Sequence, residues 1–521
     1  MKATRSHKAK VNIATTLLNQ LISTLCGIVI PRVMIGAFGS VVYGATTSIT
    51  QFLSYISLLE GGIGRVARGA LYKPLAERDE RGISRVYHAI KRFFGVVGLA
   101  FMAYTLVMAF VYHDIARIRV FDRPFTFALV WAISLSTLAK YLGGIANLTL
   151  LNADQKQYVT NLIITGTTVV NTLLIVLLVM ADSSVLLVKL GSSLIFIARP
   201  LLYSFYVKKH YRLPPVPKEE ATLPHKWNGL GQHMAYFLHT NTDVVILTLC
   251  ADLRFVSVYA VYHLIITSIR NITSSFSGGM EAALGDMIAK GEQTALKKAY
   301  DRYKLLLSTV TTVLFGVAAV MILPFVKLYT AGIHDAEYIQ PVFALLLLLA
   351  EAVNCLMLPC STLPISANRL KETQWGAYGE AIVNITLSLA LVWWDPLVGV
   401  AVGTLAAALF KGVFYMQYAV RHILHIPLRR LMRPQLIRLL LLLGIAVGGM
   451  WGSAYVPMDN FLVWCLWAVP VFLLIAAITL AANYLLEPET FRQLFRQLTH
   501  KLLHTSGDST EATDGETSDR Q

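Results

Sequence analysis

Apolar stretches of about 20 residues recur along the chain from Asn12 to Leu485, separated by short polar breaks. A helix of that length crosses the roughly 30 Å hydrocarbon core of a bilayer, and strands are usually far shorter. The pattern predicts an all-α polytopic membrane protein with about fourteen transmembrane helices. The predicted spans are residues 13–35, 41–63, 93–112, 125–150, 159–181, 184–206, 229–250, 255–277, 305–326, 340–363, 376–394, 397–418, 436–456 and 460–484.

Composition supports this prediction, because 55% of the 521 residues are hydrophobic and only 14% are charged. A soluble domain of this length would expose more charge. The first apolar run follows several lysines and an arginine but lacks a small-residue cleavage site, so we expect a retained first helix and not a cleaved signal peptide.

The net charge of +15 reports membrane topology once the basic residues are placed between the helices. Clusters such as those in residues 65–92, 208–212, 297–304 and 421–433 fall in alternate connections. The intervening connections hold few cations: Arg117, Arg119, Arg123, Arg254 and Lys327. Positive loops stay in the cytoplasm, so both termini are predicted to be cytoplasmic and nucleic acid is not an expected partner.

Several kinds of chemistry have no sequence support. The five cysteines fall in or beside predicted helices without a metal-type spacing, so we expect packed free thiols, no metal and no cofactor. The inner loops lack a Gly-rich phosphate loop and a nucleophile elbow, and the outer loops are short, so we do not expect an enzyme. The acidic, polar tail from Thr505 to Gln521 is predicted to be disordered.

An internal repeat emerges when the chain is aligned on itself. Residues Ala70–Tyr87 align without gaps on Ala283–Tyr300, a shift of 213 positions, and Val170–Asp182 fall on Val383–Asp395 at the same shift. Two six-helix lobes related by a pseudo-two-fold along the membrane normal follow as a prediction. The predicted parts are an N-lobe (1–212), a linker (213–228), a C-lobe (229–425), helices 13 and 14 (426–486) and a cytoplasmic tail (487–521).

Basic residues inside predicted spans cost roughly 2.5 to 3.5 kcal/mol each at the bilayer centre, so they are candidate functional residues. The candidate cations are Arg32, Lys140, Arg199, Arg270 and Lys411. For Arg32, Arg199 and Lys411 the alternative is that the side chain extends to the headgroups, which is also the reading for Lys189 and Arg438.

A second set of intramembrane residues is polar or acidic. It comprises Asn19, Gln20, His239, Asp243, His263, Glu351, Glu380 and Asn384. These side chains could line a polar cavity or couple transport to an ion. The alternatives are that the acids neutralise cavity cations and that the amides make interhelical hydrogen bonds.

Three stretches carry a family resemblance: Ser48–Asp79, with its LLEGGIG loop, Asn241–Leu249, and Lys371–Leu405, with its GVAVGT turn. They resemble O-antigen-type polysaccharide biosynthesis flippases of the multidrug/oligosaccharidyl-lipid/polysaccharide (MOP) exporter superfamily. The resemblance implies alternating access that moves an undecaprenyl-pyrophosphate-linked oligosaccharide from the inner to the outer leaflet of the bacterial inner membrane. It also implies a polysaccharide polymerase and glycosyltransferases as partners.

On this reading the five candidate cations bind the pyrophosphate and the polar set contacts the glycan or the coupling ion. Two alternatives stay open within the superfamily: a drug/cation antiporter and a peptidoglycan lipid-precursor flippase. The surplus of intramembrane cations over acids disfavours a cationic substrate.

Overall fold

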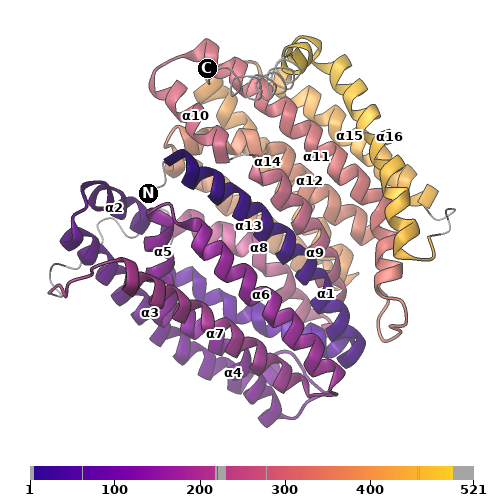
Figure 1. The fold of residues 1–521 in the computed structure, drawn as a ribbon. Coiled ribbons are helices and arrows are strands. Elements are labelled where there is room, and N and C mark those ends of the chain that lie inside the picture. Colours follow the sequence, from indigo (N-terminus) through magenta and orange to yellow (C-terminus); the bar gives the residue numbers. More distant parts are fainter. Residues whose placement is uncertain are drawn as a thin grey trace, which may run out of the picture. The chain divides into compact units, whose positions relative to one another are not determined.

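The computed structural model describes residues 5–60, 63–217, 220, 230–276, 278–453, 456 and 458–496. Helices make up the regular structure of these ranges and no strand occurs within them (Figure 1). The all-α prediction is therefore confirmed. The tail from Thr505 and much of the predicted linker lie outside the described residues.

The first seven α-helices are α1 (Arg5–Ser54), α2 (Ile63–Glu77), α3 (Glu80–Ile115), α4 (Arg123–Ala139), α5 (Ile145–Ala153), α6 (Gln157–Met180) and α7 (Val185–His210). The others are α8 (Leu230–Cys250), α9 (Leu253–Ser275), α10 (Gly278–Ala289), α11 (Gln293–Tyr329), α12 (Pro341–Ser366), α13 (Leu370–Leu391), α14 (Pro396–Ala419), α15 (Leu428–Ser453) and α16 (Phe461–Leu486). A 3₁₀ segment, η1 (Tyr55–Glu60), and two π-helical turns, η2 (Lys140–Gly144) and η3 (Val420–Leu424), continue the helices that precede them.

All fourteen predicted spans fall on these helices. Within the described residues, eleven helices are long and apolar enough to cross a membrane, and the first of them, Val11–Glu60, carries the first two predicted spans. Helices α8 and α13 carry the remaining two. The chain is a multi-pass membrane protein.

The first two predicted spans meet at a break in α1. Gly39 there has φ 84° and ψ 168°, which a side chain would strain, so the helix stops and restarts at Ser40. The restarted half runs through Ser54 and continues into η1.

The chain forms two compact units. Unit 1 comprises Met1–Ile265, Tyr329–Gln340 and Ala377–Thr404. Unit 2 comprises Ile266–Leu328, Pro341–Gly376 and Leu405–Gln521. The division into lobes at 1–212 and 229–425 stays a prediction.

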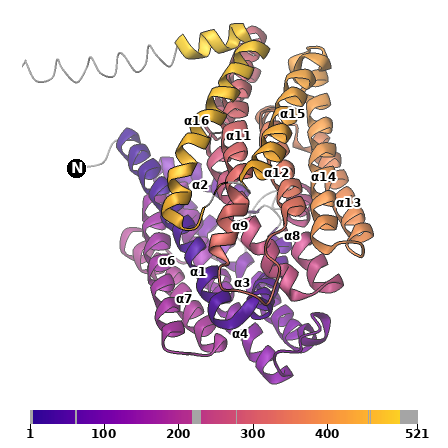
Figure 2. The ribbon, with the colours of Figure 1, turned by 90° about the vertical axis from the view of Figure 1, so that its right-hand side faces the viewer.

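In unit 1, α6 packs against α1 and α7, and α4 packs against α3 and α7 (Figure 1). Interhelical hydrogen bonds join α1 to α6: Thr165 donates to Asn19 Oδ1 (3.0 Å), and Asn161 donates to Thr16 Oγ1 (2.9 Å). In unit 2, α11 lies beside α16 (Figure 2), where Trp464 Nε1 donates to the carbonyl of Met321 at 3.1 Å.

The predicted repeat recurs in the local backbone. Arg78 and Gly291, which are related by the same shift of 213 positions, both have left-handed φ angles of 57° and 71°. Gln155 and Asn368, at the same shift, have φ angles of 56° and 54°. The hydrogen bonds closing these turns also match, because Lys156 N donates to Leu151 O at 2.9 Å and Arg369 N donates to Pro364 O at 2.8 Å.

A side-chain contact recurs as well. Tyr87 donates to Asn147 Oδ1 at 2.9 Å in unit 1, and the Tyr300 hydroxyl lies 3.1 Å from Cys360 Sγ in unit 2. Each residue of the second pair follows its counterpart by 213 positions. These local similarities agree with the predicted repeat, and the pseudo-two-fold relation between the lobes stays a prediction.

The expectation for Arg438 is wrong. Its side chain does not extend to the headgroups but is 1% exposed, with Nε donating to Asn483 Oδ1 (2.9 Å) and Nη2 to Glu487 Oε2 (3.1 Å). Glu487 also accepts from Lys304 Nζ at 2.7 Å. A carboxylate just beyond α16 therefore binds buried cations from α11 and α15, since charges away from water need a partner.

Candidate functional site

The candidate site with a cavity is centred on Lys140 in unit 1. α4 ends at Ala139, and the π-helical turn η2 places Lys140 near the middle of the 31-residue span Arg123–Ala153. π-helical turns inside α-helices frequently mark functional sites. The Lys140 side chain is 53% exposed, with Nζ 3.8 Å from Glu60 Oε1.

The same Glu60 oxygen accepts a hydrogen bond from the hydroxyl of Tyr141 at 2.6 Å. Glu60 ends η1, so this contact joins the restarted half of α1 to η2. Tyr141 holds the carboxylate tightly, whereas Lys140 is only loosely paired with it, because the Nζ–Oε1 separation exceeds hydrogen-bonding distance.

The cavity beside Lys140 has a volume of about 330 Å³. Its charged lining residues are Lys140, Lys189 and Glu60, so its net charge is positive when the three are ionised. Hydroxyl groups supply much of the remaining polarity, from Thr50, Ser54, Ser57, Ser136, Thr137, Ser192 and Ser193. A cavity with these donors suits an anionic group.

Lys189 was not predicted as a site residue. Within the described part of the chain it has no ion-pair partner, and it faces the cavity from α7. Its position close to the start of α7 suggested an interfacial anchor, and no sequence signal places it opposite Lys140.

A second candidate cluster in unit 1 surrounds Asp243 of α8, which is 3% exposed. Its Oδ2 accepts hydrogen bonds from the hydroxyls of Tyr259 (3.0 Å) and Thr404 (2.9 Å). Asn384 Nδ2 in turn donates to Thr404 Oγ1 at 3.1 Å.

This cluster brings together two predicted residues, Asp243 and Asn384, from α8 and α13. Glu380, one turn before Asn384, is also buried at 2% exposure. Tyr259 and Thr404 were missed, although Thr404 belongs to the GVAVGT stretch, which is not a turn as predicted but part of α14. A buried acid held by hydroxyl groups inside a span is typical of ion and proton pathways.

The predicted residue Arg270 lies in unit 2 and pairs with Glu351 of α12. Nη1 is 3.2 Å from Oε1, and the two side chains are 23% and 7% exposed. A substrate anion at Arg270 would have to compete with this carboxylate. The contact favours the alternative that the acid neutralises the cation.

Two other predicted cations have partners on neighbouring segments. Arg199 of α7 donates to Thr167 (2.7 Å) and Thr168 (2.8 Å) of α6. Arg32 of α1 donates to the carbonyl of Ala331 at 2.8 Å. Lys411 is half-buried on α14.

The remaining polar candidates are placed as follows. Asn19 joins α1 to α6, and Gln20 donates to Thr24 Oγ1 on its own helix at 3.4 Å. The His263 ring stacks on Tyr259, with 5.3 Å between ring centroids. The His239 side chain lies outside the described residues.

Comparison with known proteins is informative for the fold. No protein-family model matches the chain, and no curated protein sequence matches it. Solved structures do match. A lipid II flippase, MurJ, in an inward closed conformation superposes with a TM-score of 0.62 at 12% identity, covering 90% of this chain and 98% of MurJ.

Two multidrug transporters are also similar. The MATE multidrug transporter DinF-BH gives a TM-score of 0.55 at 15% identity, over 82% of this chain and 98% of that one. An inward-facing MATE transporter of the MOP superfamily gives 0.52 at 14% identity, over 76% and 94%. The chain therefore shares its fold with this lipid II flippase and these two MATE transporters. The resemblance read from the sequence is therefore confirmed for the fold, and these neighbours are transporters or flippases.

Proposed function

We propose that this MOP-type protein is a flippase in the bacterial inner membrane, with cytoplasmic termini. It moves an undecaprenyl-pyrophosphate-linked oligosaccharide from the inner to the outer leaflet by alternating access. The observation that carries the proposal is the hydroxyl-lined cavity in which Lys140 and Lys189 outnumber Glu60. A cationic drug would meet net repulsion there.

The cavity residues have complementary roles in this proposal. Lys140 and Lys189 bind the pyrophosphate oxygens, and the surrounding serine and threonine hydroxyls donate further hydrogen bonds. Tyr141 keeps Glu60 engaged, so that the incoming phosphate and not the carboxylate becomes the main partner of Lys140. Charge-assisted contacts of this kind contribute about 1.5 to 3 kcal/mol each.

Asp243 is the proposed coupling residue. Flipping a lipid-linked glycan outward needs an energy source, and a buried carboxylate that binds a cation or proton couples that source to a conformational change. Tyr259 and Thr404 hold Asp243 in place, so that ion binding alters the hydrogen bonds among α8, α9 and α14.

A peptidoglycan lipid-precursor flippase is the second candidate. It would use the same cavity, because its substrate also carries a lipid-linked pyrophosphate. The similarity to MurJ, which covers 98% of that chain, favours it. Complementation separates the two functions: restored polysaccharide export supports the first, and restored growth of cells depleted of their peptidoglycan flippase supports the second.

The pyrophosphate site is tested by Lys140→Ala and Lys189→Ala, alone and combined. Each single change is expected to weaken substrate binding roughly ten- to a hundred-fold by removing one charge-assisted contact. The double variant should abolish polysaccharide export at matched membrane abundance, and Lys140→Arg should retain part of it. Lys209→Ala, an exposed lysine at the end of α7, is the matched control. Wild-type export by the double variant would remove this cavity from the mechanism.

A further inference from the structure

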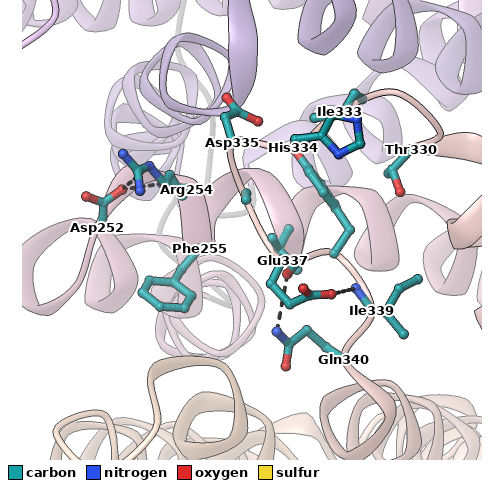
Figure 3. A pocket seen from close by; sticks show the side chains of 13 residues that line it. Asp252, Arg254, Phe255, Thr330, Ile333, His334, Asp335, Glu337, Ile339 and Gln340 are labelled. Carbon is teal, nitrogen blue, oxygen red and sulfur yellow. Dashed lines mark hydrogen bonds and ion pairs between the residues drawn. The ribbon is translucent and has the colours of Figure 1, made fainter.

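The segment Tyr329–Gln340 joins α11 to α12 and is called the strap here. Together with the turn between α8 and α9 it lines a cavity of about 610 Å³ (Figure 3). Figure 3 shows that the side chains of Asp335 and Glu337 point to different sides of the strap. The two carboxylates therefore have different partners.

Asp335 binds the break in α1. Its Oδ2 accepts from the Ser40 backbone N–H and its Oδ1 from the Ser40 hydroxyl, each at 2.6 Å. Because the helix restarts after Gly39, the Ser40 N–H has no partner within its own helix. A carboxylate from 295 residues away in sequence satisfies it.

The break is shaped to admit this carboxylate. A Cβ added at Gly39 would lie only 3.0 Å from Asp335 Oδ2. Glycine is thus required at position 39 for its backbone conformation and for the space that Asp335 occupies.

Tyr338 extends the contact to α9. Its hydroxyl lies 2.7 Å from Ser40 Oγ and 2.8 Å from Ser257 Oγ, and its carbonyl accepts from Tyr262 at 2.8 Å. Burial raises the pKa of the Tyr338 phenol, so the group stays protonated and can donate to Ser40. A chain of donors can therefore run from Ser257 through Tyr338 and Ser40 to the Asp335 carboxylate.

Next to these hydrogen bonds, α1 packs closely against the start of α9. At Gly44, one turn beyond Ser40, an added Cβ would overlap the carbonyl oxygen of Leu253 at the start of α9. Further along α1, the hydroxyls of Ser48 and Thr248 are both buried and lie 2.7 Å apart.

We propose that the strap is a releasable latch: Asp335 and Tyr338 hold the break in α1 to the start of α9 and thereby close the Gly39 end of unit 1. The next step rests on the proposed function: the Gly39 end faces outward, and the latch releases once in each transport cycle. The joint suits repeated opening, because the Asp335 residue is exposed and water can replace Ser40 as its partner. A purely apolar contact between the strap and α1 could not exchange its partner for water in this way.

The latch is tested by labelling a cysteine behind it. In a cysteine-free background, Ser48→Cys carries the reporter thiol, and spheroplasts are exposed to a membrane-impermeant maleimide. Asp335→Asn should raise the labelling rate roughly ten- to a hundred-fold, because the carboxylate contact to Ser40 is weakened. Glu337→Gln is the matched control, since the Glu337 carboxylate accepts from Ile339 N within its own strap and the change should leave the rate unaltered.

Two further variants keep the test decisive if Asp335→Asn folds poorly. Gly44→Ala should also raise labelling by wedging α1 from Leu253 while leaving Asp335 intact. Joining Ser40→Cys to Asp335→Cys with a short thiol cross-linker should suppress transport until the linker is cleaved. Unchanged labelling in both Asp335→Asn and Gly44→Ala would overturn the latch. Raised labelling in the variants, together with no polysaccharide export by the wild-type protein, would keep the latch and refute the proposed function.

Discussion

Asp243→Asn is expected to lower the rate of lipid flipping on the order of 100-fold while leaving the protein folded. Asparagine keeps the size of the side chain and can still accept from Tyr259 and Thr404, but it cannot bind a cation or proton as a carboxylate does. Coupling free energies between ligands are typically about 1 to 3 kcal/mol, which corresponds to factors of about 5 to 150. Removing the charge of Asp243 should therefore remove most of the increase in flipping rate that ion coupling provides.

The measurement is the initial flipping rate at matched abundance, with and without an imposed ion or proton gradient. The wild-type rate should respond to the gradient and the Asp243→Asn rate should not. Asp252→Asn is the control, because its carboxylate is 57% exposed at the turn after α8. A variant that flips at the wild-type rate with the same gradient dependence would exclude Asp243 as the coupling residue.

Glu487→Gln is expected to destabilise the protein by about 3 to 5 kcal/mol, because it removes the carboxylate that pairs with buried Arg438 and leaves buried Lys304 to pair with Asp301 at 3.3 Å. Both cations are nearly inaccessible, with side chains 3% and 1% exposed. Burial alone would raise the pKa of Glu487, but Lys304 and then Arg438 outweigh it and hold the pKa below its usual value.

Because the pKa is lower in the folded state, the contribution of Glu487 is fully present above its unfolded value of 4.5 and is lost as pH falls through the folded value. The thermal midpoint of the purified protein should therefore drop in Glu487→Gln at pH 7, and the difference from wild type should shrink in strong acid. Glu489→Gln, two positions on and exposed, is the control. Equal midpoints at pH 7 would contradict the role assigned to this ion pair.

The helical membrane fold could be predicted from the sequence, because the patterns that indicate it are local. A span is recognised from about 20 consecutive, mostly apolar residues, and the predicted spans fall on helices of the structure. The repeat was predicted from two aligned segments, and local turns of the backbone agree with it. Arg78 and Gly291 differ in sequence yet both adopt a left-handed backbone, so this similarity between the aligned segments is visible only in the structure.

The candidate sites were predicted less well, because partners depend on which helices meet. Helix position alone placed Arg438 near a headgroup, whereas Asn483 and Glu487 from another helix end bind it in the interior. Lys189 and Lys140 face one cavity only because α4 packs on α7. Asp335 binds Ser40 across 295 residues, a contact that no local pattern encodes.

The central claim, that this protein flips lipid-linked pyrophosphates, is tested most directly with purified protein in liposomes. An undecaprenyl-pyrophosphate-linked oligosaccharide with a fluorescent glycan is placed in both leaflets, and a membrane-impermeant quencher reports the fraction that crosses. Wild-type protein should accelerate crossing under an ion gradient, and the Lys140→Ala, Lys189→Ala double variant should match protein-free liposomes. Crossing that is no faster with wild-type protein than without it, while a cationic drug is transported, would contradict the account and favour a drug antiporter.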